Sequence, residues 1–292
     1  MSWLKLTLRV DQHQAPPLAD ALEEWGATSV TLQDASDEPI FETQWDQTPL
    51  WSQVQISALF PEHTDTDHIL LQVRELFGLS DTPAHNIEPV GDQDWAHAWK
   101  EKYRPIHMGG ALWVCPSWCE PPDKTAVNIV LDPGMAFGTG DHPTTALCLE
   151  WLAEQALQDK VVLDYGCGSG ILAIAALRLG AREAYAVDID DQSLTVTREN
   201  AERNGVAERL RIMQPSNLPA TLSADFLVAN ILAGALIELA PTLIARTKPG
   251  TGLALSGLLT EQAPEIRTHY APPFNLATRE RVGWAALAGS RP

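Results

Sequence analysis

A glycine-rich turn preceded by an acidic residue is the part of this sequence that most clearly predicts chemistry. The run Asp164-Tyr165-Gly166-Cys167-Gly168-Ser169-Gly170 follows an apolar strand at 161–163 and precedes an apolar helix at 171–179. Glycines let the backbone approach a ligand closely, and the first turn of a helix has free N–H donors. The spacing is not the dinucleotide pattern G-x-G-x-x-G, because Ile171 stands where its third glycine would be. Asp164 disfavours a pyrophosphate and suits a cationic cofactor with a free amino group.

A second acidic residue ends the next predicted strand. The run Ala184-Tyr185-Ala186-Val187 leads into Asp188, and a carboxylate at this place can accept hydrogen bonds from both ribose hydroxyls of a nucleoside. The alternative role is the N-cap of the following helix, which Asp190 or Asp191 fits better. We therefore predict that Asp188 binds ribose. The pattern D-x-G-x-G-x-G followed by such an acid is typical of methyltransferases that use S-adenosylmethionine, which is the cofactor we expect.

A loop upstream of the turn, at 132–145, adds candidate cofactor contacts. It has three glycines within seven residues and then Pro143 at a predicted helix start, which is typical of a loop lying over a ligand. The hydroxyls of Thr144 and Thr145 either cap this helix or hold the methionine carboxylate. Phe137 is expected to cover the sulfonium or the adenine.

Asn230 follows the predicted strand 225–229 and is the catalytic candidate. Its amide oxygen can accept a hydrogen bond from an amine and orient the nitrogen lone pair. Methyltransferases that modify nucleobases or glutamine usually have Asn-Pro-Pro-Tyr here, whereas this chain has Asn230-Ile231-Leu232-Ala233. This difference favours a flexible alkyl amine, whose usual pKa of about 10.4 falls on partial desolvation. His142 is an alternative proton acceptor, although a lone histidine is more often structural.

Strands and helices alternate around these residues, which predicts an α/β fold with a doubly wound sheet. The expected strands are 161–163, 184–188, 210–213, 225–229, 253–255, 278–282 and 284–287, and the expected helices are 171–179, 192–204, 236–246 and 261–269. The last two strands are joined at or near Gly283 and are therefore antiparallel. We expect the seven-stranded, Rossmann-like sheet of class I methyltransferases, in a domain spanning residues 134–292.

The first 90 residues predict a separate, smaller α+β domain. Period-two strands and 3.6-period helices follow one another in the order β-α-β-β-α-β, which is the ferredoxin-like arrangement. We expect this domain, residues 1–90, to recognise the substrate. A connector, residues 91–133, is expected to hold a helix at 92–103 and short strands near 111–115 and 126–131.

Charge is the unusual feature of the composition. The 292 residues have a formal net charge of −18, which disfavours direct nucleic-acid binding and favours a cationic partner. Residues 1–95 hold 17 acidic and three basic residues, and therefore most of that charge. The alternative is that these acidic residues only make the surface of the domain soluble.

Cys115 and Cys119 lack a second Cys/His pair, so we expect no metal. No apolar run approaches 20 residues, and no signal peptide opens the chain, so we expect no membrane contact and a cytoplasmic location.

Taken together, the motifs resemble the bacterial methyltransferases of ribosomal protein L-eleven, the PrmA family. The resemblance is carried by the acidic N-terminal domain, Trp95, Trp99 and Lys100, the loop Phe137-Gly138-Thr139-Gly140, and Asn230-Ile231-Leu232. It implies cofactor contacts at Thr145, Gly166, Asp188 and Asn230. It also implies methylation of lysine side chains and the N-terminal amine of one basic ribosomal protein, docked on the acidic domain. The alternatives are methylation of nucleic acid or a small metabolite, and a non-catalytic binder of basic proteins.

Overall fold

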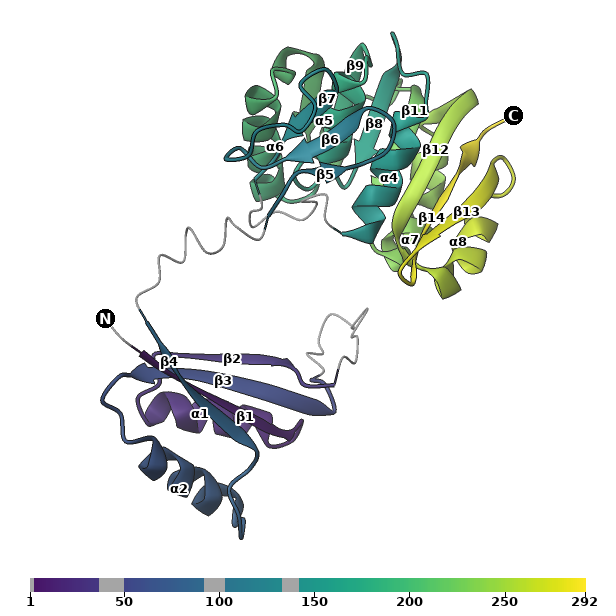
Figure 1. Cartoon of the computed structure of the whole chain (residues 1–292). Helices are drawn as coiled ribbons and strands as arrows, with labels where there is room; N and C mark the ends of the chain where they lie inside the picture. Colours follow the sequence, from purple (N-terminus) through teal and green to yellow (C-terminus); the bar gives the residue numbers. More distant parts are fainter. Residues whose placement is uncertain (1–2, 37–49, 92–102, 133–141) are drawn as a thin grey trace. The chain divides into compact units, whose positions relative to one another are not determined.

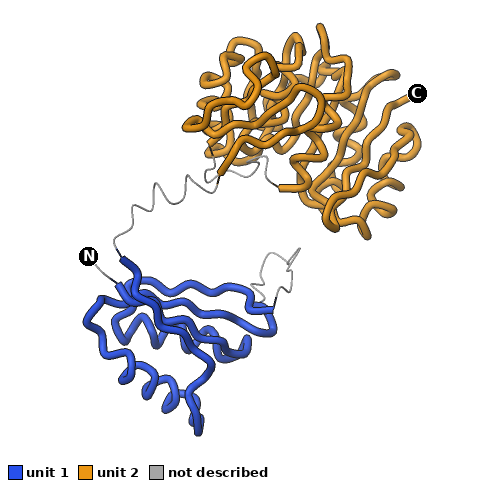
Figure 2. The backbone as a smooth tube through the Cα atoms, viewed as in Figure 1, with its two compact units in different colours: residues 1–99 blue, residues 100–292 orange. Residues whose placement is uncertain are grey.

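The structure, a computed structural model, describes residues 3–36, 50–91, 103–132 and 142–292. The chain forms two compact units, Met1–Trp99 and Lys100–Pro292, which Figure 2 shows in two colours. The predicted helix at 92–103 lies almost entirely outside the described residues. Within the described part of the chain, no helix is long and apolar enough to cross a membrane.

The first unit has the β-α-β-β-α-β order predicted for it. Its elements are β1 Trp3–Asp11, α1 Ala15–Glu24, β2 Ser29–Asp34, β3 Gln53–Pro61, α2 Thr66–Phe77 and β4 His85–Val90. The four strands form an antiparallel sheet in the order β2-β3-β1-β4, with α1 and α2 on one face (Figure 1). Leu6 and Leu8 of β1 and Ile56 of β3 are fully buried in the core of this unit. Alternate residues such as Thr7 and Arg9 face away from this core, which is the one-sided burial of a two-layer fold.

The second unit is built on a seven-stranded sheet in the order β10-β9-β8-β11-β12-β14-β13 (Figure 1). Its strands are β8 Val161–Tyr165, β9 Glu183–Val187, β10 Leu210–Met213, β11 Ala224–Asn230, β12 Thr247–Leu259, β13 Asn275–Arg281 and β14 Trp284–Ser290. Neighbours from β10 to β12 are parallel, whereas β14 runs antiparallel to β12 and to β13. The predicted seven-stranded sheet with an antiparallel last pair is confirmed.

Helices cover both faces of this sheet. The helical elements are α4 Pro143–Ala153, α5 Ile171–Arg178, α6 Asp191–Arg203, α7 Ala233–Ile244 and α8 Ala263–Tyr270, with 3-10 turns at Ala207–Arg209, Pro215–Asn217 and Thr260–Gln262. Val162 of β8 packs into a core shared with α4, α5 and α6, while its neighbour Leu163 packs into a core shared with α7 and α8. Burial on both faces explains why β8 reads as a continuous apolar run.

The strand order places a crevice at the carboxyl ends of β8 and β11. The chain moves from β8 outward to β9 and β10, and then returns to β11 on the other side of β8. At such a reversal the connections leave in opposite directions, and ligands of open α/β sheets bind there. The glycine-rich turn follows β8, and Asn230 is the last residue of β11, so both predicted features meet at this point.

A small three-stranded sheet completes the second unit. It consists of β5 Ile106–His107, β6 Leu112–Cys115 and β7 Val127–Val130. The side chain of Asn204, just after α6, joins it to the large sheet's helices: Nδ2 donates to the carbonyl of Val130, and Oδ1 accepts from the N–H of Val130, each over 2.8 Å. The strands predicted for the connector therefore pack in the same compact unit as the large sheet.

One predicted strand is longer in the structure, and it is irregular near its start. The strand expected at 253–255 is β12, which spans Thr247–Leu259 and so includes Pro249 and Gly250. Gly250 has a φ of 86° and its N–H donates to the carbonyl of Arg291 over 2.8 Å. The strand continues because the C-terminal residues pair with this irregular stretch, and that pairing is not visible in the local sequence.

Candidate active site

The glycine-rich turn has a backbone that other residues adopt only with strain. Gly166, Gly168 and Gly170 have φ values of 77°, 53° and 78°. A Cβ on Gly166 would lie 2.1 Å from the Cγ2 atom of Ile231. A side chain at this position would therefore meet both an unfavourable backbone conformation and a neighbouring strand end.

Two polar residues of α6 donate hydrogen bonds to carbonyl groups of the glycine-rich turn. The Thr197 hydroxyl donates to the carbonyl of Gly168, and Nδ2 of Asn200 donates to the carbonyl of Ser169, each over 2.9 Å. Thr197 is fully buried and Asn200 nearly so. With both carbonyls engaged on the helix side, the opposite side of the turn faces the crevice.

Asp188 lies at the end of β9, where its carboxylate is held by backbone N–H groups. Oδ2 accepts from Gly168 over 2.8 Å and Oδ1 accepts from Asp190 over 3.0 Å. The neighbouring Asp190 caps α6 by accepting from Gln192 and Ser193, and these hydrogen bonds lower its pKa. The cap is therefore Asp190, and the remaining lone pairs of Asp188 are available to a ligand.

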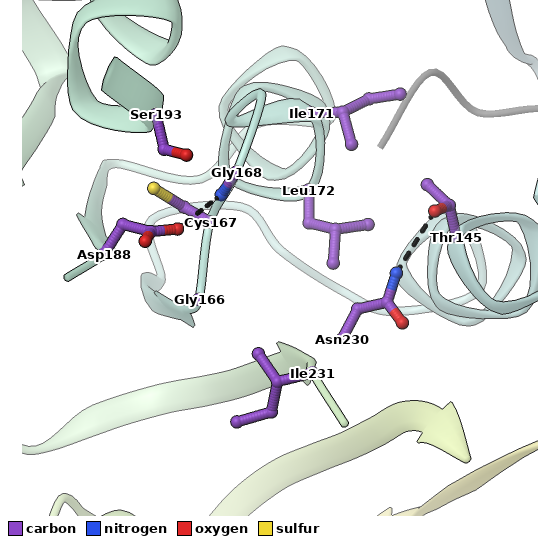
Figure 3. A pocket seen from close by; sticks show the side chains of 10 residues that line it. All are labelled: Thr145, Gly166, Cys167, Gly168, Ile171, Leu172, Asp188, Ser193, Asn230 and Ile231. Carbon is purple, nitrogen blue, oxygen red and sulfur yellow. Dashed lines mark hydrogen bonds between the residues drawn. The ribbon is translucent and has the colours of Figure 1, made fainter. Parts of the chain in front are cut away.

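These groups line a cavity of about 220 Å³ (Figure 3). Its wall combines the glycine-rich turn, the first turns of α4, α5 and α6, the residue that follows β9 and the end of β11. The lining residues are Thr145, Gly166, Cys167, Gly168, Ile171, Leu172, Asp188, Ser193, Asn230 and Ile231. The structure thus brings five of the predicted site residues to one cavity.

Two other predicted contacts, Asp164 and Gly170, lie outside the residues that line this cavity. Asp164 is fully buried, and its Oδ2 accepts from the N–H of Ala173 in the first turn of α5 over 3.0 Å. Burial raises the pKa of Asp164 to about 7, and the nearby Asp188 carboxylate adds to that rise. Asp164 therefore stabilises the N-terminus of α5, where the N-cap residue Gly170 has no side chain to do so. The other carboxylate oxygen, Oδ1, is buried and has no hydrogen-bond partner among the described residues, so the cofactor contact of Asp164 stays a prediction.

A second cavity, of about 330 Å³, adjoins the first one. Its lining residues are His142, Thr144, Asn230, Ile231, Leu232, Gly257 and Trp284. Asn230 and Ile231 line both cavities. Thr144, predicted as a cofactor contact, lines the second cavity and not the first.

The amide of Asn230 is fixed on one side only. Its Nδ2 donates to the hydroxyl oxygen of Thr145 over 3.1 Å, as Figure 3 shows. Its Oδ1 is buried and has no hydrogen-bond partner among the described residues. A buried acceptor without a partner costs about 1–3 kcal/mol, so this atom is either a defect or a group reserved for a ligand.

Gly257 determines where the segment after Asn230 can lie. It sits in β12 at a shift in register against β14, between Ser256 and Leu258, with a φ of 88°. A Cβ on Gly257 would lie 2.2 Å from the carbonyl oxygen of Ile231. Bulges of this kind often occur beside active sites, where they redirect a strand.

His142 acts as the N-cap of α4. Its Nδ1 accepts from the N–H of Thr144 and lies 2.7 Å from the Thr144 hydroxyl oxygen. Its ring meets the Trp284 ring edge-on, with 4.7 Å between centroids. Because Nδ1 accepts the capping hydrogen bond, the neutral imidazole carries its proton on Nε2. This arrangement favours the structural role over that of a proton acceptor.

Ion pairs attach the hairpin that carries Trp284 to α4. Arg281 of β13 pairs with Glu150 over 2.7 Å, and Arg279 pairs with Glu154 through both guanidinium nitrogens. The wall of the second cavity is therefore joined to the helix that holds Thr144 and Thr145. Phe137, the remaining predicted contact, lies outside the described residues.

Comparison with known proteins decides between the alternatives left by the sequence. The family model of the ribosomal protein L11 methyltransferases (PrmA) matches residues 2–292. The chain belongs to this family. It is similar to the ribosomal protein L11 methyltransferases of Pseudomonas putida (strain W619), at 51% identity, and Shewanella baltica (strain OS223), at 48% identity, in each case over 100% of both chains.

A solved structure supports the same assignment. The ribosomal protein L11 methylase of Lactobacillus delbrueckii subsp. bulgaricus is 35% identical, with a TM-score of 0.58, and the match covers 65% of this chain and 99% of that one. Membership of the PrmA family supports the predicted protein methyltransferase function and not the nucleic-acid or metabolite alternative. S-adenosylmethionine as methyl donor is consistent with this family.

Several residues of this PrmA-family site were missed in the sequence. Gly257 had a weak signal, because an isolated glycine inside an apolar strand often marks a bulge or a close approach of backbone. Thr197 and Asn200 are polar residues on the buried side of α6, but nothing local shows what they bind. Nothing in the local sequence indicated that Trp284 lies at the site.

Of the four cysteines, Cys115, Cys148 and Cys167 are buried and Cys119 is partly exposed. No group of three metal-ligating side chains occurs among the described residues.

Proposed function

We propose that this protein transfers methyl groups from S-adenosylmethionine to lysine side-chain and N-terminal amines of ribosomal protein L11, in the cytoplasm. The observation that carries the proposal is the buried Oδ1 of Asn230, which lacks a partner among the described residues at the point where the two cavities share their lining. A methyl group that passes from one ligand to another has to cross the place where the two binding sites meet, and Asn230 lies at that place. The full-length similarity to ribosomal protein L11 methyltransferases supports the choice of substrate.

The first cavity suits the cofactor. Asp188 offers carboxylate lone pairs to the ribose hydroxyls, and Gly166 and Gly168 allow close approach because they have no side chains. The hydroxyl of Thr145 is placed to donate to the methionine carboxylate. When bound, S-adenosylmethionine supplies an electrophilic methyl group on a positively charged sulfur.

The second cavity suits an alkyl amine. Ile231, Leu232 and Trp284 give it apolar and aromatic walls, and the amide oxygen of Asn230 is its buried acceptor. Apolar walls disfavour the charged ammonium and so lower the pKa of an entering lysine. The amide is neutral, so it orients an N–H without stabilising the ammonium as strongly as a carboxylate would.

The reaction is an in-line displacement, in which positioning supplies most of the rate. The amine nitrogen donates its lone pair to the methyl carbon, the sulfur–methyl bond breaks, and sulfur keeps that electron pair as a neutral thioether. The amine loses one proton to solvent for each methyl group it gains. In this scheme Asn230 holds an N–H of the amine, so that the lone pair points toward the first cavity.

Charge in the first unit supports docking of a basic protein there. Exposed acids lie along both of its helices and their ends: Asp20, Glu23, Glu24, Asp65, Asp67 and Glu75. Two of its three cations, Lys5 and Arg9, lie instead on β1, and Lys5 is paired with Glu88. We therefore assign docking to the helix layer of this unit. No nucleic-acid contact is part of the proposal.

The function is tested by offering substrates in competition. The purified protein is incubated with methyl-labelled S-adenosylmethionine and an equimolar mixture of unmethylated ribosomal protein L11, deacylated tRNA and a pool of small metabolites. We expect label in the L11 band, on lysine and N-terminal amines by peptide mass spectrometry. Label in tRNA or metabolites with an unlabelled L11 band would contradict the proposal.

Docking is tested by reversing charge on α1. Replacing Asp20, Glu23 and Glu24 together by lysine is expected to raise KM for L11 about tenfold at low salt, because the surface loses its attraction for a basic protein. The effect should shrink as salt is added. The matched control reverses three exposed acids of the second unit, Glu199, Glu202 and Glu208. Equal effects of the two triple variants would show that net charge alone matters, and would contradict docking on α1.

A further inference from the structure

We propose that Thr145 is a positioning residue for methyl transfer. It acts through Asn230, by setting whether the oxygen or the NH2 group of the Asn230 amide faces the amine that is methylated. This inference rests on the proposed function, because it assumes that an amine is held by Asn230. It concerns a role separate from any contact that Thr145 makes with the cofactor. The two residues come from different elements, the first turn of α4 and the last position of β11.

The geometry leaves this task to Thr145. Its side chain is fully buried, and its hydroxyl oxygen accepts from Nδ2 of Asn230 over 3.1 Å. Within the described part of the chain, this is the one hydrogen bond of the Asn230 side chain, since Oδ1 has no partner there. The hydroxyl of the adjacent Thr144 is engaged elsewhere, because it lies 2.7 Å from Nδ1 of His142.

Packing alone cannot orient an amide. The oxygen and the NH2 group of asparagine have nearly the same size, so apolar neighbours such as Ile231 accept either orientation. The two orientations differ chemically, because the oxygen accepts a hydrogen bond and the NH2 group donates one. If the amide rotated by half a turn, its N–H groups would face the N–H groups of the incoming amine, and the lone pair would no longer be directed at the methyl group.

The hydrogen bond to Thr145 therefore has a consequence for specificity. With Nδ2 engaged, the group presented to the shared region of the two cavities is an acceptor. An acceptor selects a ligand that donates, such as a neutral primary or secondary amine. It disfavours a carboxylate or a ring nitrogen that carries only a lone pair.

A double-mutant cycle separates this role from a purely structural one. The measured quantity is kcat at saturating cofactor and saturating L11, for the wild type, Thr145→Val, Asn230→Ala and the double variant. Valine keeps the shape of threonine and removes the hydroxyl. We expect Thr145→Val to lower kcat about tenfold or more in the wild type and to have less than about a twofold effect in Asn230→Ala, because coupled residues are not additive. Thr145→Ser, which keeps the hydroxyl, should retain kcat within about threefold.

Two controls keep the cycle interpretable. The affinity for S-adenosylhomocysteine, measured by calorimetry for all four proteins, reports any separate contact of Thr145 with the cofactor. Thermal unfolding shows whether each variant is folded, and Thr145→Ala replaces the valine variant if that protein is unstable. An equal loss of kcat from Thr145→Val in both backgrounds would overturn the proposal while leaving the role of Asn230 intact. A wild-type kcat for Asn230→Ala would instead remove the catalytic role on which both proposals depend.

Discussion

Replacement of Asn230 by alanine is expected to lower kcat for methylation of L11 about 100- to 1,000-fold. The variant removes the buried oxygen that is placed between the two cavities, and loss of one preoriented polar group at a reacting centre typically has an effect of this size. The folded structure should survive, because the lost side chain makes one hydrogen bond to the described residues, to Thr145. Initial rates with methyl-labelled cofactor at saturating concentrations measure the effect.

Asn230→Asp sharpens this prediction. A carboxylate has the same shape but stabilises the ammonium form of the substrate, so it raises the pKa of the bound amine. We expect a low rate at neutral pH that recovers in part as the pH rises, because more of the amine is then deprotonated. The matched control is Asn217→Ala, at an exposed position of a 3-10 turn. A rate for Asn230→Ala within threefold of wild type would exclude Asn230 as the residue that orients the amine.

Replacement of Asp188 by alanine is expected to weaken cofactor binding about 100- to 10,000-fold. Two hydrogen bonds from ribose to a charged carboxylate are worth about 1.5–3 kcal/mol each, and each 1.4 kcal/mol is a factor of ten in affinity. The variant also frees the N–H of Gly168, which the carboxylate now holds within the glycine-rich turn. Calorimetry with S-adenosylhomocysteine measures the loss directly and does not depend on the rate of methyl transfer.

The adjacent Asp190 provides the matched control for this variant. Asp190 caps α6 through Gln192 and Ser193 and does not line the first cavity. Asp190→Ala should therefore cost about 1 kcal/mol of stability, as the loss of an N-cap usually does, and leave the affinity within about threefold of wild type. If Asp188→Ala bound S-adenosylhomocysteine as tightly as the wild type, the ribose would have to be held elsewhere.

Local sequence was sufficient for the features that depend on a few consecutive residues. The glycine-rich turn needs φ values that only glycine adopts easily, so its position could be read directly from Gly166, Gly168 and Gly170. The prediction that Asp190 or Asp191, and not Asp188, caps α6 also rested on positions within one strand end, and the cap is Asp190. Contact of Asp188 with the ribose stays a prediction. Alternation of apolar strands and helices predicted the seven-stranded sheet, because a parallel sheet needs helices on both faces.

Local sequence could not give the surroundings of a group whose position depends on a distant part of the chain. Asp164 was predicted as a cofactor contact from the turn alone, but its surroundings come from the fold: Oδ2 accepts from the N–H of Ala173 in α5, and Oδ1 has no partner among the described residues. Thr144 and Thr145 were given the same two alternative roles, but adjacent helical residues point in different directions, and the two line different cavities. The greater length of β12 has the same origin, since Gly250 in its irregular stretch pairs with Arg291.

The sequence by itself therefore determined the type of fold, the glycine-rich turn and the acid that follows it, because backbone conformation and side-chain periodicity are local properties. Only the tertiary structure decided what surrounds Asn230. Trp284 and Gly257 reach it because β14 inserts antiparallel between β12 and β13 and because β12 bulges toward Ile231. Strand order and register are set by packing across the whole sheet, and no window of neighbouring residues contains that information.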